Sequence, residues 1–404
     1  MARFLTLRDL QVRGKRVLVR EDLNVPLKEG AVRDDTRIRA AVPTLRYLRE
    51  HGARTVIVSH LGRPEGQRKP ELSLRPVAEA LSKALGAPVQ FCDQTVGPTA
   101  DAAVAALRDG EIVLLENVRF DPGEEANDPA FAAALAKHGD LYVNDAFGTA
   151  HRAHASTAGV AADLPAAAGF LMEAELQALF NLLNAPAKPF ICVLGGAKVA
   201  DKIGVFMHLM QRCDAFVVGG GMANTFLAAQ GVDVGASLRD KDLSPAHEIL
   251  ARARAGGVTI HLPVDAVAAA SLDAPQEQTR VVDVGIGASP LRDGEMLLDI
   301  GPKTRERYER VVEQAKTIVF NGPMGVYEKT PFQRGTAAVG EAIAAATAAG
   351  AVSVVGGGDA AAAAHALGFA DRVTHVSTGG GATLEFLEGR ELPGVAALEK
   401  AAVR

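Results

Sequence analysis

Short β-branched apolar runs alternate with helix-like segments along the whole chain. Each run holds three to six residues and leads into a polar or glycine-rich turn. This alternation predicts βαβ units and therefore parallel sheets flanked by helices. The predicted strands are Arg16–Arg20, Thr55–Ser59, Glu111–Leu115, Leu141–Val143, Pro189–Leu194, Ala215–Val218, Val258–Leu262, Thr317–Phe320, Val352–Val355 and Thr374–Val376.

Helical periodicity indicates how these strands divide into domains. In Met172–Leu183 the apolar residues recur at helical spacing, and the breaker Asn184-Ala185-Pro186 follows. Ten strands are many for one sheet, so we expect an α/β fold with two Rossmann-like domains, residues 1–171 and 172–388, in which residues 172–184 form a connecting hinge helix. Further predicted helical segments are Leu74–Leu85, Asp101–Leu107, Ala342–Ala349 and Ala360–Ala366.

The composition is typical of a soluble globular protein, with 404 residues, 48% hydrophobic and 23% charged. It excludes disorder and collagen-like structure, and no apolar run approaches the roughly 18–20 residues of a membrane helix. The first twenty residues mix charges into every turn, unlike a signal peptide. The three cysteines, Cys92, Cys192 and Cys213, fit neither a disulfide framework nor zinc-ligand spacing, so we expect reduced thiols and a cytoplasmic location.

Charge is distributed unevenly along the chain. The net charge of −5 argues against a nucleic-acid binder that depends on bulk positive charge. Residues 1–171 nevertheless hold 17 Arg and 5 Lys against 22 acidic residues. Arginine binds carboxylates and phosphates with two parallel hydrogen bonds, so some of these side chains could share one pocket. The alternative is that they are scattered over the solvated surface.

The residues that follow the strands of the first half favour a pocket. In parallel α/β sheets, ligands bind at the carboxyl ends of the strands. Three of these ends lead to an arginine, and two deliver acid or amide groups. The pattern predicts a site for a small anion with more than one acidic group. The four segments are Glu21–Asn24, His60–Arg63, Glu116–Arg119 and Asn144–Phe147, the last continuing to His151-Arg152.

The strands of the second half lead into glycine-rich turns instead. Glycine at a strand-to-helix turn lets backbone N–H groups approach a phosphate, and five such turns predict a nucleotide site. Tight packing is the alternative for any single turn. Neither a Walker motif nor G-x-G-x-x-G is present, which argues against a P-loop NTPase and an NAD dehydrogenase. The turns are Gly195–Lys198, Gly219–Gly221, Asn321–Gly325, Gly356–Asp359 and Gly379–Gly381.

Charged residues beside these turns extend the nucleotide hypothesis. Lys198 and Lys202 are four apart at the start of a predicted helix and could both reach phosphates. Their alternative is a pair of solvated lysines. Asp359 directly follows three glycines and suits a Mg²⁺ carboxylate ligand, although an N-cap aspartate fits the same position.

A half for a small polyanion and a half for a nucleotide together imply phosphoryl transfer. No Ser–His pair or H-E-x-x-H motif supports hydrolysis or metalloprotease chemistry.

Two alternative functions are compared with phosphoryl transfer between these halves. A different small-molecule kinase or ATP-dependent ligase would keep the glycine turns and change the arginine set. A two-domain binding protein of the periplasmic kind would have a signal peptide and no nucleotide turns, the opposite of this sequence.

The ordered set of motifs resembles the phosphoglycerate kinase family over essentially the whole chain. No single motif is specific, but their collinear order is. The matching stretches are Asp22–Pro26, Ser59–Pro64, Glu116–Phe120, Asn144–Thr157, Leu194–Ile203, Gly219–Phe226, Asn321–Glu328, Gly356–Asp359, Val376–Glu385 and Leu387–Val395.

The resemblance implies roles for individual residues. The 3-phosphoglycerate site would comprise Asp22, Leu23, Asn24, Arg37, His60, Leu61, Gly62, Arg63, Arg119 and Arg152. The nucleotide site would comprise Gly195, Lys202, Gly219, Gly220, Asn321, Glu328, Gly356, Gly357, Gly358 and Asp359, with Glu328 on the ribose, Gly195, Gly219 and Gly220 at the adenine and Asp359 on Mg²⁺. The transferring group would be neutralised by Arg37, Lys198 and Lys202 and by backbone N–H groups near Gly358 and Gly381.

The resemblance also implies the reaction and the state of the molecule. We expect a glycolytic and gluconeogenic kinase that transfers a phosphoryl group reversibly between 1,3-bisphosphoglycerate with MgADP and 3-phosphoglycerate with MgATP. We further expect a cytoplasmic monomer that closes about its hinge, without a nucleic-acid or membrane partner, whose tail, residues 389–404, packs back on the first domain. Glu21, Phe320 and Ala360 depart from the residues that the family usually has at these positions.

Overall fold

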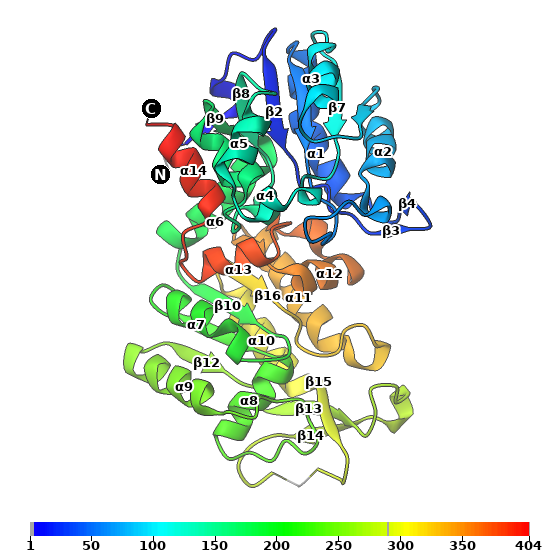
Figure 1. Cartoon of the computed structure of the whole chain (residues 1–404). Helices are drawn as coiled ribbons and strands as arrows, with labels where there is room; N and C mark the ends of the chain where they lie inside the picture. The colour runs from blue at the N-terminus through cyan, green and yellow to red at the C-terminus, as the bar shows by residue number, and fades with distance from the viewer. Residues whose placement is uncertain (1–3, 289–290, 404) are drawn as a thin grey trace. The chain divides into compact units, whose positions relative to one another are not determined.

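The computed structural model describes residues 4–288 and 291–403 of the chain. It divides into two compact units (Figure 1). Unit 1 is Met1–Gln177 with Glu391–Arg404, and unit 2 is Ala178–Arg390. The division falls inside helix α6, Phe170–Asn184, which covers the segment expected as the connecting helix.

Unit 1 is built on a seven-stranded sheet in which every neighbouring pair of strands is parallel. Its four central strands are those that the sequence predicts, to within one residue. In spatial order the strands are β1 (Leu5–Thr6), β9 (Ala166–Ala168), β8 (Leu141–Asn144), β2 (Arg16–Arg20), β5 (Arg54–Val58), β7 (Ile112–Leu115) and β6 (Gln90–Cys92).

Helices of unit 1 bury apolar stripes against this sheet. Leu45 and Leu48 of one helix and Leu81 of the next lie in the same core as Val17 and Ile57 of the sheet. Proline at the start of α2 and left-handed Gly86 after its last residue limit that helix. The helices are α1 (Thr36–Glu50), α2 (Arg75–Leu85), α3 (Pro98–Ala105), α4 (Pro122–Glu125), α5 (Pro129–Ala136) and α14 (Pro393–Ala401).

Unit 2 contains a second parallel sheet, of six strands. All six are predicted strands of the second half, which confirms the fold class. In spatial order they are β12 (Thr259–His261), β11 (Ala215–Val218), β10 (Phe190–Leu194), β16 (Thr317–Asn321), β17 (Val352–Val355) and β18 (His375–Val376). The helices are α7 (Ile203–Leu209), α8 (Gly220–Ala229), α9 (Ser244–Gly256), α10 (Pro302–Glu313), α11 (Arg334–Ala348), α12 (Gly358–Ala366) and α13 (Gly381–Leu387).

Several strands escape the sequence prediction. Strand β9 is three alanines, and alanine favours helix, but the chain here pairs on both sides with β1 and β8. Unit 2 adds an antiparallel sheet whose central strand is also rich in alanine. The missed strands outside the parallel sheets are β13 (Asp265–Ala269), β14 (Arg280–Asp283) and β15 (Met296–Ile300), with the hairpin β3 (Leu27–Lys28) and β4 (Ala31–Val32).

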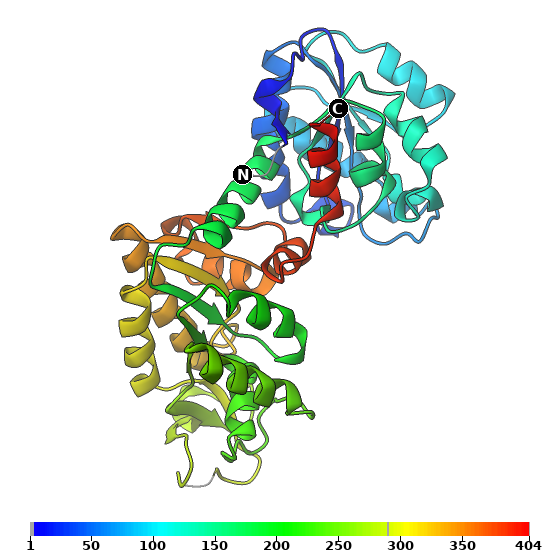
Figure 2. The ribbon, with the colours of Figure 1, turned by 90° about the vertical axis from the view of Figure 1, so that its left-hand side faces the viewer.

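Helix α14 belongs to unit 1 although unit 2 separates it in sequence from the rest of that unit. Figure 2 shows it in red against the elements of unit 1. The Gly394 N–H donates to the Ala150 carbonyl at 2.8 Å, and Leu398 is fully buried. The helix contacts β9 and the segment 155–162.

Candidate active site

A polar cavity of about 450 Å³ lies at the carboxyl edge of the sheet in unit 1. The segments that follow β2, β5, β7 and β8 contribute to it together with α1 and α4. Residues distant in sequence meet here because parallel strands end at the same edge. The lining residues are Asp22, Asn24, Arg37, His60, Gly62, Arg63, Arg119, Glu125, Gly148, Thr149, His151, Arg152 and His154.

Eight of the ten residues expected to bind the substrate line this cavity. The other two, Leu23 and Leu61, do not line it. Both side chains are buried in the hydrophobic core of unit 1, because they alternate with polar neighbours that face the cavity. Their side chains therefore do not reach the cavity, and their place in the substrate site stays a prediction from the resemblance.

Two of the four arginines that line the cavity, Arg37 and Arg119, are held by partners within unit 1. Arg37 Nη1 donates to both carboxylate oxygens of Asp22 at 2.8 Å. Arg119 Nη1 donates to the Gly62 carbonyl at 2.8 Å, and its Nε lies 3.2 Å from the Glu125 carboxylate. These contacts fix the guanidinium groups before any ligand arrives.

Glycine is required at position 62. Its φ of +63° is in the left-handed region, and a Cβ would lie 2.8 Å from the Leu72 side chain. Its N–H donates to Asn24 Oδ1 at 2.9 Å, which orients that amide at the cavity. The glycine therefore positions two cavity groups, the Asn24 amide and, through its carbonyl, Arg119.

Two histidines of the cavity, His60 and His154, are uncharged at neutral pH. Burial lowers the pKa of His154 to about 4, and the nearby charges of Arg119, Arg20 and Arg152 act in the same direction. Burial also holds the pKa of His60 well below its usual value. These two histidines therefore add no positive charge to that of the arginines.

Four lining residues were not predicted: Glu125, Gly148, Thr149 and His154. Glu125 ends the four-residue helix α4, several positions after the strand it follows. Gly148 and Thr149 lie in a 3-10 turn, and His154 lies beyond Arg152. The only sequence signal for Gly148, Thr149 and His154 was their position within the long motif Asn144–Thr157, which does not tell where each side chain points. Glu125 lies outside that motif.

In unit 2 the five glycine-rich turns follow strands β10, β11, β16, β17 and β18, which are neighbours in one parallel sheet. Two of the glycines are explained by packing. A Cβ at Gly195 would lie 1.9 Å from the Pro323 carbonyl, and one at Gly219 would lie 2.6 Å from Met324 Sδ. Gly358 differs, because a Cβ there would meet no atom of the described chain within 4 Å. Since it begins α12, its N–H is available to an anion.

Lys202 lies among these turns. Its ammonium donates to the carbonyls of Gly195, at 2.7 Å, and Asn321, at 2.6 Å. Burial lowers its pKa to about 8, and the carboxylates of Asp359 and Asp201 oppose that shift. An ammonium has three N–H donors, so one remains for a ligand after these two bonds.

The other predicted nucleotide residues differ in exposure. Lys198, Glu328 and Asp359 are exposed, whereas Asn321 is buried. The Asn321 amide donates to the Gly356 carbonyl, and its Oδ1 is buried without a hydrogen-bond partner in the described part of the chain. Asn321 thus joins two neighbouring turns and retains one free acceptor.

The residues present fit a Mg²⁺ ion that is bound together with a nucleotide. No group of three or more His, Cys, Asp or Glu among residues 4–288 and 291–403 could hold a metal alone. Mg²⁺ with a nucleotide takes one or two carboxylates and completes its shell with phosphates and water. Asp359, exposed in the first turn of α12, supplies such a carboxylate.

A narrow apolar crevice of about 20 Å³ adjoins the glycine turns of unit 2. Gly220, Leu298 and Met324 are among its lining residues, whereas Gly195 and Gly219 are not. Of the three glycines expected at the adenine, only Gly220 therefore reaches this crevice.

Within the described residues, no helix is long and apolar enough to cross a membrane.

The fold and the two sets of residues define a class: a small-molecule kinase that has an arginine-lined anion cavity in one α/β unit and phosphate-type turns in the other. A family model described as phosphoglycerate kinase matches residues 7–390. The chain belongs to the phosphoglycerate kinase family. It is 56% identical over 400 residues to the phosphoglycerate kinase of Chloroflexus aurantiacus, covering 98% of this chain and 99% of the relative.

Further phosphoglycerate kinases match the chain over nearly its whole length. The phosphoglycerate kinase of Moorella thermoacetica is 53% identical over 397 residues, covering 98% of each chain. The phosphoglycerate kinase structure from Coxiella burnetii superimposes with a TM-score of 0.89 at 42% identity, covering 99% of this chain and 100% of the other. That from Pyrococcus horikoshii gives a TM-score of 0.84 at 35% identity, covering 99% of each chain.

Proposed function

We propose that this chain catalyses the reaction of its family, the reversible transfer of a phosphoryl group between 1,3-bisphosphoglycerate with MgADP and 3-phosphoglycerate with MgATP. The observation that carries the proposal is the cavity of unit 1. There Arg37, Arg63, Arg119 and Arg152 come together at the carboxyl edge of a parallel sheet. Their number suits a ligand with a phosphate at one end and a carboxyl or acyl-phosphate group at the other.

The chemistry of the acceptor removes the need for a general base. A carboxylate with an ordinary pKa is ionised at neutral pH, so its oxygen can attack without losing a proton. Both carboxylate oxygens of Asp22 accept hydrogen bonds from Arg37. Catalysis then depends on positioning the two substrates and stabilising the transferring charge. Arg37, Lys198 and the backbone N–H groups near Gly358 and Gly381 are proposed for that stabilisation.

The glycine-rich turns of unit 2 are proposed as the nucleotide site. Lys202 and the N–H groups at the start of α12 would hold phosphates, and the exposed Glu328 would accept hydrogen bonds from the ribose. Bound Mg²⁺ would supply neutralising charge to the phosphates, with Asp359 as its protein ligand. Gly220 and its apolar neighbours would meet the base, which requires the crevice to widen.

The experiment is ATP-dependent phosphorylation of 3-phosphoglycerate by the purified protein, with glycerate and acetate as control acceptors. Glycerate retains the carboxylate and hydroxyls and lacks the phosphate, so it tests whether the arginines need both anionic ends. We expect activity with 3-phosphoglycerate only. Equal activity with glycerate would favour a less specific carboxylate kinase, and no activity in either direction would contradict the proposal.

We infer further that the protein works as a cytoplasmic monomer. Three free, buried cysteines are consistent with a reducing compartment. Transfer also requires the reacting atoms to come within about 3–3.5 Å, so we expect ligand-linked closure about the hinge helix. Small-angle scattering should give a smaller radius of gyration with both 3-phosphoglycerate and a non-hydrolysable ATP analogue than with either alone. Light scattering tests the monomer.

A further inference from the structure

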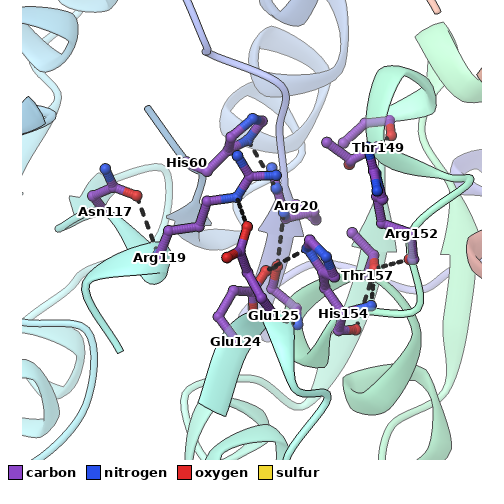
Figure 3. A network of polar contacts seen from close by, with 12 residues as sticks. Arg20, His60, Asn117, Arg119, Glu124, Glu125, Thr149, Arg152, His154 and Thr157 are labelled. Atoms are coloured by element: carbon purple, nitrogen blue, oxygen red, sulfur yellow. Dashed lines mark hydrogen bonds and ion pairs between the residues drawn. The ribbon is translucent and has the colours of Figure 1, made fainter. Parts of the chain in front are cut away.

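A buried arginine lies behind the cavity of unit 1. Arg20 ends strand β2, has no exposed surface and is not among the lining residues. Figure 3 shows Arg20 beside His60 and Glu124. Each nitrogen of its guanidinium group has a different partner. Nε donates to Ser156 Oγ at 2.8 Å, Nη1 donates to the Glu21 carbonyl, and Nη2 lies 3.1 Å from Nδ1 of His60.

The contact between Arg20 and His60 determines where the imidazole proton resides. A guanidinium nitrogen can only donate, and arginine keeps its proton in proteins. Nδ1 of His60 must therefore accept the hydrogen bond with its lone pair, which leaves the ring proton on Nε2. His60 itself is buried and lines the cavity, so the remaining ring nitrogen is the one available to a ligand.

A carboxylate on the other side of Arg20 fixes the direction of this chain of hydrogen bonds. The Ser156 hydroxyl donates to Glu124 Oε1 at 2.6 Å, and the Ser156 N–H donates to Glu124 Oε2 at 2.9 Å. Because the hydroxyl proton is used by Glu124, Ser156 Oγ accepts from Arg20. Glu124 is fully buried, and its charge compensates that of the arginine. Every donor in the chain thus points from Arg20 outward.

The surroundings of His60 keep it neutral. Burial lowers its pKa well below the usual value, and four groups from separate segments reinforce that shift: Arg20, Arg119, Arg37 and His154. Were Arg20 absent, one positive neighbour and the enforced acceptor role of Nδ1 would both disappear. His60 could then carry its proton on either nitrogen and become charged at a higher pH.

We propose that Arg20 is a positioning residue that holds His60 as the Nε2–H tautomer, a neutral donor facing the ligand among charged arginines. The Nε2–H group of His60 donates a hydrogen bond to an uncharged or anionic oxygen of the ligand, and it cannot accept one. The site therefore combines the charged guanidinium donors of its arginines with one neutral donor of fixed direction. The assignment of the ligand as 3-phosphoglycerate rests on the proposed function, but the tautomer does not.

The first test is ¹⁵N NMR of the histidine side chains in the full-length, ligand-free protein, with His60 assigned by comparison with His60→Gln. We expect a protonated Nε2, an unprotonated Nδ1 and no titration of His60 from pH 5.5 to 8.5. A proton on Nδ1, or titration near pH 6.5, would overturn the proposal. This measurement needs no substrate, so it stands apart from the activity assay.

The second test uses Arg20→Met, with KM for 3-phosphoglycerate measured against pH. We expect KM about tenfold above wild type at pH 8, since one well-directed donor is lost. The ratio of the two KM values should fall toward one as the pH drops through the ordinary histidine pKa, because imidazolium always carries a proton on Nε2. A structural defect alone would give a ratio independent of pH, and that result would contradict the positioning role.

Two further variants complete the test. Arg20→Lys retains a donor, so His60 should keep the Nε2–H tautomer even if Arg20→Met does not fold; loss of the tautomer in a folded Arg20→Lys protein would count against the proposal. Arg16→Met is the matched control. Arg16 begins the same strand but does not line the cavity, and its guanidinium pairs with the Asp140 carboxylate at 2.7 Å. Its loss should therefore leave the His60 spectrum unchanged.

Discussion

At the level of single residues, Arg37 is one of the two cavity arginines with defined side-chain partners. Its guanidinium is held by Asp22 and is accessible to a ligand. We expect Arg37→Ala to lower kcat about 10²–10³-fold, because one donor to the developing charge is lost, and to leave ADP affinity unchanged. Steady-state kinetics and calorimetry measure the two. Arg39→Ala, which removes an exposed arginine paired with Asp35, is the control. A kcat near wild type would remove Arg37 from the mechanism.

Lys202 provides a prediction that depends on pH. Burial lowers its pKa to about 8, so the ammonium loses its charge as the pH rises through that value. ADP affinity should therefore fall between pH 7 and 9. Lys202→Met should bind ADP about 10–100-fold more weakly at pH 7, with little dependence on pH over this range. Calorimetric titration measures both effects.

The control for that titration is Lys303→Met, which removes an exposed lysine that pairs with Asp283. It should behave like wild type at every pH. If Lys202→Met binds ADP normally, the two carbonyl contacts of Lys202 are structural and the lysine has no part in nucleotide binding.

The sequence could predict cavity residues where local rules suffice. Asp22, His60 and Arg152 follow strands, and the shared edge of a parallel sheet brings such residues together. Arg20 could not be found in this way. It is the last residue of a strand, and the sequence does not distinguish it from an arginine on the surface. Its role depends on contacts with Ser156 and, through it, Glu124, and these residues become neighbours only in the folded chain. The three residues that depart from the family's usual ones, Glu21, Phe320 and Ala360, are all buried, and none of them lines the cavity of unit 1.

At the level of elements, the start of α6 depends on one buried carboxylate. Asp145 Oδ1 accepts from the N–H groups of Leu171, at 2.8 Å, and Met172, at 3.1 Å. Its Oδ2 is buried without a hydrogen-bond partner in the described residues. Burial raises the pKa of Asp145 to about 6, although the Thr44 side chain and the N–H groups of Met172 and Leu171 act in the opposite direction. Above that pH the helix start therefore includes a buried negative charge.

Asp145→Asn should therefore stabilise the protein at neutral pH. The amide oxygen keeps both helix contacts and carries no charge. With its pKa raised from an ordinary value of 3.8, folded Asp145 holds its proton longer than the unfolded chain does, so wild-type stability falls as the pH rises through the window from 3.8 to about 6. The advantage of the variant should grow from near zero at pH 4 to about 1–3 kcal/mol at pH 7, measured by urea unfolding.

Asp145→Ala is the comparison, since it removes the charge and the helix contacts together. It should be less stable than Asp145→Asn at both pH values. A stability difference between wild type and Asp145→Asn that does not change with pH would show that the carboxylate is not strained by burial.

Elements that the sequence could not predict share a physical cause. The parallel strands of both units read as Val- and Ile-rich runs because helices cover both faces of the sheets. Strands β9 and β13 are rich in alanine and take their conformation from their neighbours in the sheet. Local propensity favours helix there, and only pairing, which depends on residues far away in sequence, reverses it.

At the level of the whole molecule, residues 391–404 complete unit 1. Leu392, Val395 and Leu398 of this segment are buried. Deleting 391–404 should destabilise unit 1 by about 5 kcal/mol, on the basis of about 1.5–3 kcal/mol for each buried side chain. Hydrogen exchange should increase most at β9 and at residues 155–162, which α14 contacts.

The matched control is deletion of residues 402–404 alone, which leaves α14 intact. It should preserve wild-type exchange throughout unit 1. If the longer deletion also leaves exchange at β9 unchanged, the segment is an appendage and unit 1 is complete without it.

The interrupted course of unit 1 has a consequence for biosynthesis. Residues 391–404 leave the ribosome after every residue of unit 2, so unit 2 is the first part of the chain that can fold to completion during translation, although unit 1 begins earlier. Until then the surface that α14 covers is exposed on the nascent chain. Unit 1 thus keeps part of its apolar surface uncovered for longer during synthesis than unit 2 does.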